Sequence, residues 1–167
     1  GEVMIGGKNV KNIRYETLLQ NISIVFQKTF LTQDSVFDNI CMGTNASLTQ
    51  VREAASKAQI DDFIMSLPKG YETVIGEGGA SLSGGEKQRI SIARAMMKDA
   101  PVIFLDEATA NVDPENENEL MRAIQELTKN KTVIIIAHRL KTVKYADQIL
   151  VVENGKIVQC GTHTQLM

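Results

Sequence analysis

The stretch LSGGEKQRISIARAMMKDAPVIFLDE, residues 82–107, decides the fold, because it encodes a helix start, a helix and a buried strand in succession. Ser83 followed three residues later by Glu86 is the pattern of a capping box, which begins a helix. Apolar residues then recur at helical spacing through about Lys98. The all-apolar run 102–105 predicts a strand covered on both faces, as in a parallel sheet. We therefore expect a helix that leads directly into a central strand.

The segments on either side of this stretch extend the same alternation. Residues 21–26 are rich in β-branched and apolar side chains and predict a strand that stops at Gln27. After the central strand, Asp113 followed by Pro114 predicts a capped helix, and residues 132–137 predict another apolar strand. The order strand, helix, strand, helix, strand favours a right-handed, parallel α/β core.

Two further segments complete the predicted architecture. Ser47 begins a second capping box, and the apolar stripe that follows predicts a helical insertion ending near Pro68, within a helical subdomain of about residues 34–98. Asn154-Gly155 lies between two apolar runs, 148–152 and 156–160, and predicts an antiparallel hairpin after the parallel core.

Composition limits the function classes. The chain has 167 residues and is 43% apolar, which excludes collagen-like and wholly disordered proteins. Its net charge of -2, from 18 Lys and Arg against 20 Asp and Glu, gives no broad electrostatic case for binding nucleic acid or an anionic membrane. No apolar run approaches the ~20 residues that span a bilayer, so membrane attachment would need a partner.

The cysteines and the chain ends carry weaker signals. Cys41 and Cys160 lack the spacing of a zinc site, fit a reducing compartment and are expected to be buried free thiols. The sequence starts with Gly1, and its last residues predict a helix that has barely begun, so we expect both ends to be cut.

Polar side chains follow each predicted strand at the edge where parallel sheets bind ligands. Asp106 suits magnesium, and Glu107 beside it could deprotonate a water molecule for attack on a phosphate. His138 and Gln27 follow the other two strands and could contact a phosphate, a water molecule or a metal ion. Taken alone, each of these residues more often has an ordinary structural role.

Residues 82–88 give a stronger signal, because they combine the hydroxyl of Ser83, the two glycines Gly84 and Gly85, and the positive end of a helix dipole. Exposed backbone N–H groups at a helix N-terminus bind anions. The alternative, a glycine turn that only begins a helix, is common for two glycines and less so for the whole heptapeptide. The sequence therefore favours contact with a phosphate.

In order, these residues resemble the motifs of the nucleotide-binding domain of ATP-binding cassette (ABC) transporters. Residues 82–88 resemble the signature segment and residues 102–106 the second Walker motif. Residues 73–79 and the spacing of Phe26-Gln27 to Phe30-Leu31 resemble exporter-type members. Three further motifs are matched in order by Gln27 (Q-loop), residues 110–113 (D-loop, with Asn111-Val112 where Ala-Leu is frequent) and His138 (switch histidine).

The resemblance implies a P-loop NTPase-like fold, ATP and Mg²⁺ as cofactors, and head-to-tail pairing with a second nucleotide-binding domain. It also implies a transmembrane partner, a location at the cytoplasmic face of a membrane and no nucleic-acid partner. The implied catalytic residues are Glu107, His138 and Gln27, and the implied metal ligands are Asp106 and Gln27. The residues implied to contact nucleotide are Ser83, Gly84, Gly85, Glu86 and Asp113.

One motif that such an ATPase needs is missing from the sequence. Gly-x-x-x-x-Gly-Lys-Ser/Thr does not occur, and the near match in residues 1–9 has the wrong spacing and lacks the hydroxyl. The resemblance places residues 1–7 in a strand pair downstream of the phosphate-binding loop, so we expect that loop, with its strand and helix, upstream of Gly1. The parent protein is then an ATPase of an exporter, and this chain alone is expected to be inactive.

Two rival functions and one surface prediction stay open at this point. A non-catalytic partner or scaffold would not need Glu107 and His138. A soluble cassette ATPase of DNA repair would need an insertion between Gln27 and Ser83 for which there is little room. Residues 27–40 are expected to meet the transmembrane partner, although Phe37 could equally belong to the core, as could Ile40.

Overall fold

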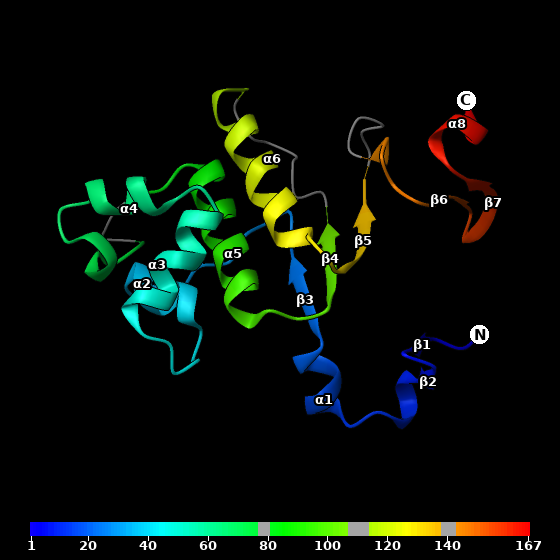
Figure 1. Ribbon diagram of the computed structural model, residues 1–167, viewed down its shortest axis with the longest axis horizontal. Helices are drawn as coiled ribbons and strands as arrows, with labels where there is room; N and C mark the ends of the chain where they lie inside the picture. The colour runs from blue at the N-terminus through cyan, green and yellow to red at the C-terminus, as the bar shows by residue number, and fades with distance from the viewer. Residues whose placement is uncertain (77–80, 107–113, 138–142) are drawn as a thin grey trace. The chain divides into compact units, whose positions relative to one another are not determined.

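The computed structural model describes residues 1–76, 81–106, 114–137 and 143–167, which form two compact units, residues 1–134 and 135–167. The first unit contains a parallel α/β core with a group of helices beside it (Figure 1). The second contains an antiparallel hairpin and a short helix. The expected fold class, an α/β protein with a helical region and a C-terminal hairpin, is confirmed.

The core sheet has the strand order β3-β4-β5, with β3 at Ile22–Val25, β4 at Val102–Asp106 and β5 at Thr132–Ile136. β3 and β4 run parallel, and Val25 lies opposite Leu105 in the register. The Thr132 N–H donates to the Pro101 carbonyl at 3.0 Å where β5 begins.

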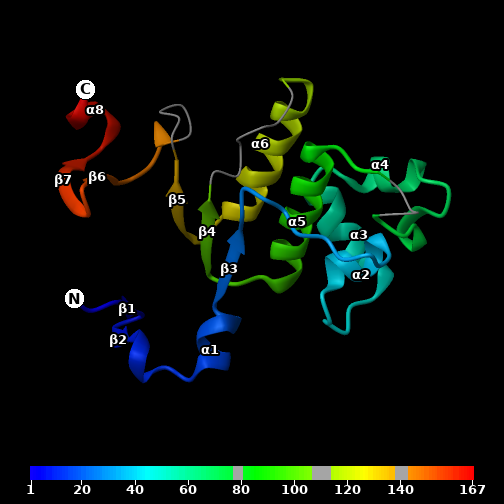
Figure 2. The same cartoon turned by 180° about the vertical axis from the view of Figure 1, so that it is seen from behind.

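The sheet is buried on one face only. Val25, Ile103 and Leu105 point into the core, on the side where Figures 1 and 2 place α5 and α6. On the other face Ile24 is 46% exposed and Ile134 is 45% exposed. In β4 itself, Val102 and Phe104 on this face are half-buried, so the predicted coverage of residues 102–105 on both faces is only partial in the described part of the chain.

Helix α5 (Gly84–Lys98) is the central element of the first unit, and its buried residues include Ile90, Ile92 and Ala93. Its predicted capping box is present, and it ends at Asp99, whose φ is 50°. The Lys98 Nζ donates to the Ile22 carbonyl at 2.6 Å, which ties the end of the helix to the start of β3. Helix α6 (Pro114–Thr128) buries Leu120, Ala123 and Leu127.

The predicted helical insertion is broken into two helices, α3 (Leu48–Lys57) and α4 (Asp61–Ser66). Gln59 between them has a left-handed φ of 57°, which ends α3 and redirects the chain. Apolar residues on both sides of the break face the interior, since Ala55, Ile60 and Ile64 are all buried. The predicted helical insertion is therefore confirmed as two helices, and so is the capping box of Ser47 with Gln50.

A helix that the sequence did not predict, α2 (Val36–Cys41), begins at Ser35. The Ser35 Oγ accepts from the Asp38 N–H at 3.0 Å, which caps the first turn. A short antiparallel bridge pairs Ser35 with Val74, so the start of α2 lies beside the segment after the short 3-10 helix at Gly70–Glu72.

The N-terminal part of the first unit begins with the strand pair expected from residues 1–7. Strands β1 (Met4–Ile5) and β2 (Lys8–Asn9) pair antiparallel around Gly6 and Gly7, whose φ angles of 54° and 75° suit a tight hairpin turn. A single 3-10 turn, Val10–Asn12, and helix α1 (Tyr15–Gln20) lead into β3.

The second unit confirms the predicted hairpin. β6 (Ile149–Glu153) and β7 (Lys156–Gly161) pair antiparallel across Asn154 and Gly155, which have φ angles of 50° and 74°. Positive φ at both central residues is the signature of a type I′ turn. The chain then forms the short helix α8 (His163–Leu166).

The cysteines differ in exposure: Cys41 is buried and Cys160 is exposed, so burial of both thiols is wrong. Cys160 lies in β7, where five of six residues are exposed. Within residues 1–76, 81–106, 114–137 and 143–167, no helix is long and apolar enough to cross a bilayer.

Candidate functional site

The start of α5 is fixed by reciprocal hydrogen bonds between Ser83 and Glu86. The Glu86 N–H donates to the Ser83 Oγ at 3.3 Å, and the Ser83 N–H donates to the Glu86 carboxylate at 2.7 Å. Ser83 itself has extended backbone angles, φ −64° and ψ 165°. The cap therefore satisfies the N–H of Ser83, just before the helix, and the N–H of Glu86, the third residue of the helix.

The N–H groups of Gly84 and Gly85 follow this cap; Gly84 is exposed, whereas Gly85 is buried. No acceptor among the described residues is hydrogen-bonded to either group, and the first N–H groups of a helix have no intrahelical partner. Such groups and the helix dipole are what an anion site requires, and contact with a phosphate stays a prediction. Glu86 has a capping role here, because its carboxylate turns back to the Ser83 N–H.

A second side chain of α5, Gln88, connects this helix start to the end of β3. Gln88 is 4% exposed; its Nε2 donates to the Phe26 carbonyl at 3.2 Å, and its Oε1 accepts from the Thr29 hydroxyl at 2.6 Å. These two contacts lie on either side of Gln27 in the sequence. The structure therefore joins residues 82–88 to the predicted Gln27 site, a link that the sequence analysis missed.

Asp106 ends β4 next to the end of β3. Because Val25 pairs with Leu105, the next residues, Phe26 and Asp106, leave the sheet at the same level. Asp106 is half-buried, and Gln27 is exposed. The chemistry of this donor set fits Mg²⁺, which prefers carboxylate and amide oxygens and retains water in its shell. Within the described ranges no cluster of three or more His, Cys, Asp or Glu residues forms a metal site.

Three predicted site residues, Glu107, Asp113 and His138, lie outside the described residues. Residues 77–79 of the exporter-type loop and residues 110–112 of the D-loop lie outside them as well. The described part of the loop ends at Gly76, whose φ is 107°. A Cβ at Gly76 would lie 3.1 Å from the Cγ of Gln33, so this position requires glycine for both conformation and space.

The segment after Gln27 divides into exposed and buried parts. Phe30 is 74% exposed, as expected for a surface that meets a partner. Val36 and Ile40 are fully buried, however, so their inclusion in the predicted partner surface is wrong. The reason is that α2 turns its apolar side chains onto α3 and α5, a helical pattern too short to recognise in the sequence.

Asn39 and Arg94 organise the buried side of this segment. Asn39 is fully buried; its Oδ1 accepts from the Thr32 N–H at 2.9 Å and its Nδ2 donates to the Thr32 carbonyl at 3.1 Å. The Arg94 Nε donates to the Asn39 carbonyl at 2.8 Å, and its Nη1 donates to the Phe30 carbonyl at 3.1 Å. The only sequence signal was an arginine among the apolar residues of α5.

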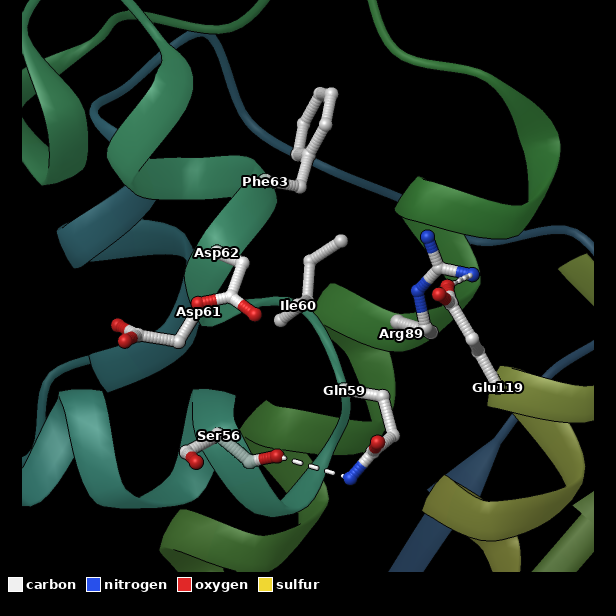
Figure 3. Close-up of a pocket in the computed structure, with 8 residues that line it drawn as sticks. All are labelled: Ser56, Gln59, Ile60, Asp61, Asp62, Phe63, Arg89 and Glu119. Atoms are coloured by element: carbon white, nitrogen blue, oxygen red, sulfur yellow. Dashed lines mark hydrogen bonds and ion pairs between the residues drawn. The ribbon is translucent and has the colours of Figure 1, made fainter.

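α5 is also joined to α6 by an ion pair, shown in Figure 3. The Arg89 Nη1 lies 3.0 Å from the Glu119 carboxylate, and the arginine side chain is 4% exposed while that of Glu119 is 51% exposed. The pair lines an open cavity of about 240 Å³ whose opposite wall comes from the start of α4. The pair thereby fixes the helix after the β4 loop against the helix that begins at Gly84.

A separate polar network holds α3 to α4. Asp61 accepts two hydrogen bonds from the Arg52 guanidinium, at 2.9 and 3.1 Å, and one from the Tyr71 hydroxyl at 2.6 Å. The hydrogen bonds from Arg52 lower the pKa of the Asp61 carboxyl. Burial, followed by the hydrogen bond to Asp61, raises the pKa of Tyr71.

Comparison with known proteins establishes the family of this chain. The family model described as "ABC transporter" matches residues 1–110, which is most of the chain and includes residues 82–88, Gln27 and Asp106. The chain belongs to the ABC transporter family. The order of motifs that the sequence analysis recognised is thereby explained by common descent.

Individual relatives of this chain support the assignment to the ABC transporter family. The ATP-dependent lipid A-core flippase of Methylococcus capsulatus is 46% identical over 169 residues, covering 100% of this chain and 28% of the relative. The mycobactin import ATP-binding/permease protein IrtA of Mycolicibacterium smegmatis is 46% identical over 168 residues, covering 100% of this chain and 19% of the relative.

The fold agrees as well. The solved structure of a bacterial Atm1-family ABC exporter with ATP bound superposes with a TM-score of 0.90 at 39% identity, covering 99% of this chain and 29% of that chain. This ABC transporter chain therefore spans less than a third of the length of the proteins that it matches.

Proposed function

We propose that this chain is the nucleotide-binding part of an ABC exporter that hydrolyses ATP to move a substrate across a membrane. One observation carries the proposal: the Gly84 and Gly85 N–H groups that begin α5 have no hydrogen-bond acceptor among the described residues, and Gln88 of the same helix is bonded to the strand end that precedes Gln27. An anion-binding helix start is thus attached to the edge of the sheet where Asp106 lies.

The N-terminus of α5 acts as an electrostatic site for the γ-phosphate of ATP held by a second domain. The Gly84 and Gly85 N–H groups donate to phosphate oxygens, with Ser83 and Glu86 keeping that turn in shape. Asp113, in the D-loop, is assigned to the same nucleotide interface.

Asp106 and Gln27 would hold Mg²⁺ at the sheet edge. When bound, the ion supplies positive charge that neutralises the phosphate oxygens of ATP. Glu107 accepts a proton from the attacking water, and His138 donates a hydrogen bond to the phosphate. The transferred group is the γ-phosphoryl group, which passes from ADP to water.

The phosphate-binding loop of the same domain would come from a segment of the parent protein upstream of this chain. The sequence contains no Gly-x-x-x-x-Gly-Lys-Ser/Thr, so this chain alone is expected to show negligible ATP hydrolysis. Addition of the upstream segment of the parent protein should restore Mg²⁺-dependent turnover. Turnover at an ordinary enzymatic rate by this chain alone would contradict the proposal.

The transmembrane partner would meet the exposed part of the segment after Gln27, where Phe30 projects. The protein would then lie at the cytoplasmic face of the membrane. Export is favoured by the similarity to the lipid A-core flippase and the Atm1-family exporter, whereas one relative is named for import. Cysteine cross-linking from position 30 to the cytoplasmic loops of the full-length protein tests the contact, and failure at every exposed position of this segment would count against it.

The dimer role of α5 is tested by Gly85→Asp in the complete domain. A carboxylate at this position repels the phosphate that must approach it, so ATP-driven dimerisation should be lost while ATP affinity is retained. Thermal stability is measured as well, because Gly85 is buried. Asn45→Asp, which adds the same charge at an exposed position, is the matched control. Dimerisation that persists in a folded Gly85→Asp protein rejects the assignment, and loss of all three properties indicates a structural role for the glycine.

A further inference from the structure

The segment 26–39 is attached to α5 at two separate places. Apart from α2, these residues belong to neither a helix nor a strand. The first attachment is Gln88, which bonds the Phe26 carbonyl and the Thr29 hydroxyl. It lies within the second turn of α5, directly after the anion-binding turn at Ser83.

The second attachment is Arg94, whose guanidinium divides its hydrogen bonds among three oxygen atoms of the segment. These are the Phe30 carbonyl, the Asn39 carbonyl and the Asn39 Oδ1, at 3.1, 2.8 and 3.4 Å. The ion pairs found within the described residues do not include Arg94, so the geometry of its fork is used for positioning rather than for charge pairing. A lysine ammonium cannot reproduce this planar arrangement.

The two attachments are far enough apart to fix a direction as well as a position. Six residues of helix separate Gln88 from Arg94, which is about 9 Å along the axis. A single contact would let the segment pivot about α5. Two contacts at this separation make it follow both the translation and the rotation of the helix.

We propose that Gln88 and Arg94 are positioning residues that make the segment 26–39 and the anion-binding turn of α5 move as one rigid body. A displacement of Phe30 at a partner surface is then transmitted to Ser83, Gly84 and Gly85. This inference rests on the proposed function for its consequence in catalysis, although the attachment itself can be tested without it.

The test uses the full-length parent protein with Gln88→Met, Arg94→Met, the double variant and Arg94→Lys. Met matches Gln in length, replaces the apolar stem of Arg, and removes the hydrogen bonds of both side chains. Arg52→Met is the matched control, because it removes a guanidinium with two hydrogen bonds from α3 in the same helical region. Amide hydrogen exchange is measured for peptides covering 26–34 and 48–66, together with kcat and KM for Mg²⁺-ATP.

In the double variant we expect exchange in 26–34 to accelerate by about tenfold or more, with exchange in 48–66 changed by less than about twofold. The kcat should fall by about tenfold, because the anion-binding turn no longer follows the segment, while KM changes by less than about twofold. Arg94→Lys should leave exchange in 26–34 close to that of Arg94→Met. Arg52→Met should accelerate exchange in 48–66 and leave 26–34 unchanged.

Three results would overturn the inference. Unchanged exchange in 26–34 in the double variant shows that other contacts hold the segment. Equal acceleration in both peptide groups shows that the two residues only stabilise the helical region. Faster exchange in 26–34 with unaltered kcat shows that the attachment is not used in turnover. If the wild-type protein does not hydrolyse ATP, the proposed function fails, and the exchange data alone decide whether the attachment exists.

Discussion

Replacement of Asn39 by Ala should destabilise the start of the helical region by about 3 kcal/mol. The Asn39 carboxamide bonds the N–H and the carbonyl of Thr32 and also contacts the Arg94 Nη2. Alanine leaves these three groups without that partner. Each partly buried polar group that loses its hydrogen bond costs about 1 kcal/mol, which gives the total.

Native-state hydrogen exchange in the full-length protein provides the assay, because a change of about 3 kcal/mol corresponds to an approximately hundredfold larger opening constant for α2. Asn45→Ala is the control, since Asn45 is exposed and its replacement should alter stability by less than about 0.5 kcal/mol. A change below about 1 kcal/mol for Asn39→Ala would refute the reasoning, because it would mean that water replaces the carboxamide at little cost.

The remaining predictions concern the site and the α3 to α4 network. In the full-length protein Glu107→Gln should retain ATP binding and lose turnover, since an amide cannot accept the proton; unchanged steady-state hydrolysis would exclude Glu107 as the base. Ser83→Ala should lower the stability of α5 by about 1 kcal/mol through loss of the cap, measured by denaturant unfolding. Tyr71→Phe should destabilise by about 1.5 kcal/mol or more, because Asp61 loses a charge-assisted hydrogen bond. The lowered pKa of Asp61 means that its stabilising effect is complete above its ordinary value of 3.8 and is lost as the pH falls through the lower folded value, so Asp61→Asn should cease to differ from wild type in strong acid.

The structural features that could be predicted from the sequence are those that depend only on neighbouring residues. The caps at Ser47 and Ser83 and the turn at Asn154-Gly155 are local, because each requires side chains or backbone angles within a few positions. The break at Gln59 was not predictable, since a left-handed conformation of glutamine is imposed by the packing of α3 and α4 rather than by its own preference. For the same reason α2, with six residues, is stabilised by its tertiary contacts.

The residues of the candidate site also separate into those recognisable from local sequence and those that depend on distant partners. Gln27, Ser83, Gly84, Gly85 and Asp106 could be identified from strand ends and from a capping pattern. The roles of Gln88 and Arg94 could not be identified in this way, because their hydrogen-bond partners are 55 to 64 positions distant in the sequence.

The unequal exposure of the two cysteines makes this chain suited to thiol chemistry. Cys160 on β7 is accessible to an alkylating reagent in the folded state. Cys41 ends α2, is 5% exposed and has a pKa raised by burial, so little reactive thiolate is present at neutral pH. Brief labelling therefore modifies the first cysteine selectively, and the slower labelling of the second records each opening of α2. Two reaction rates from one unaltered chain thus report separately on the surface and on the interior.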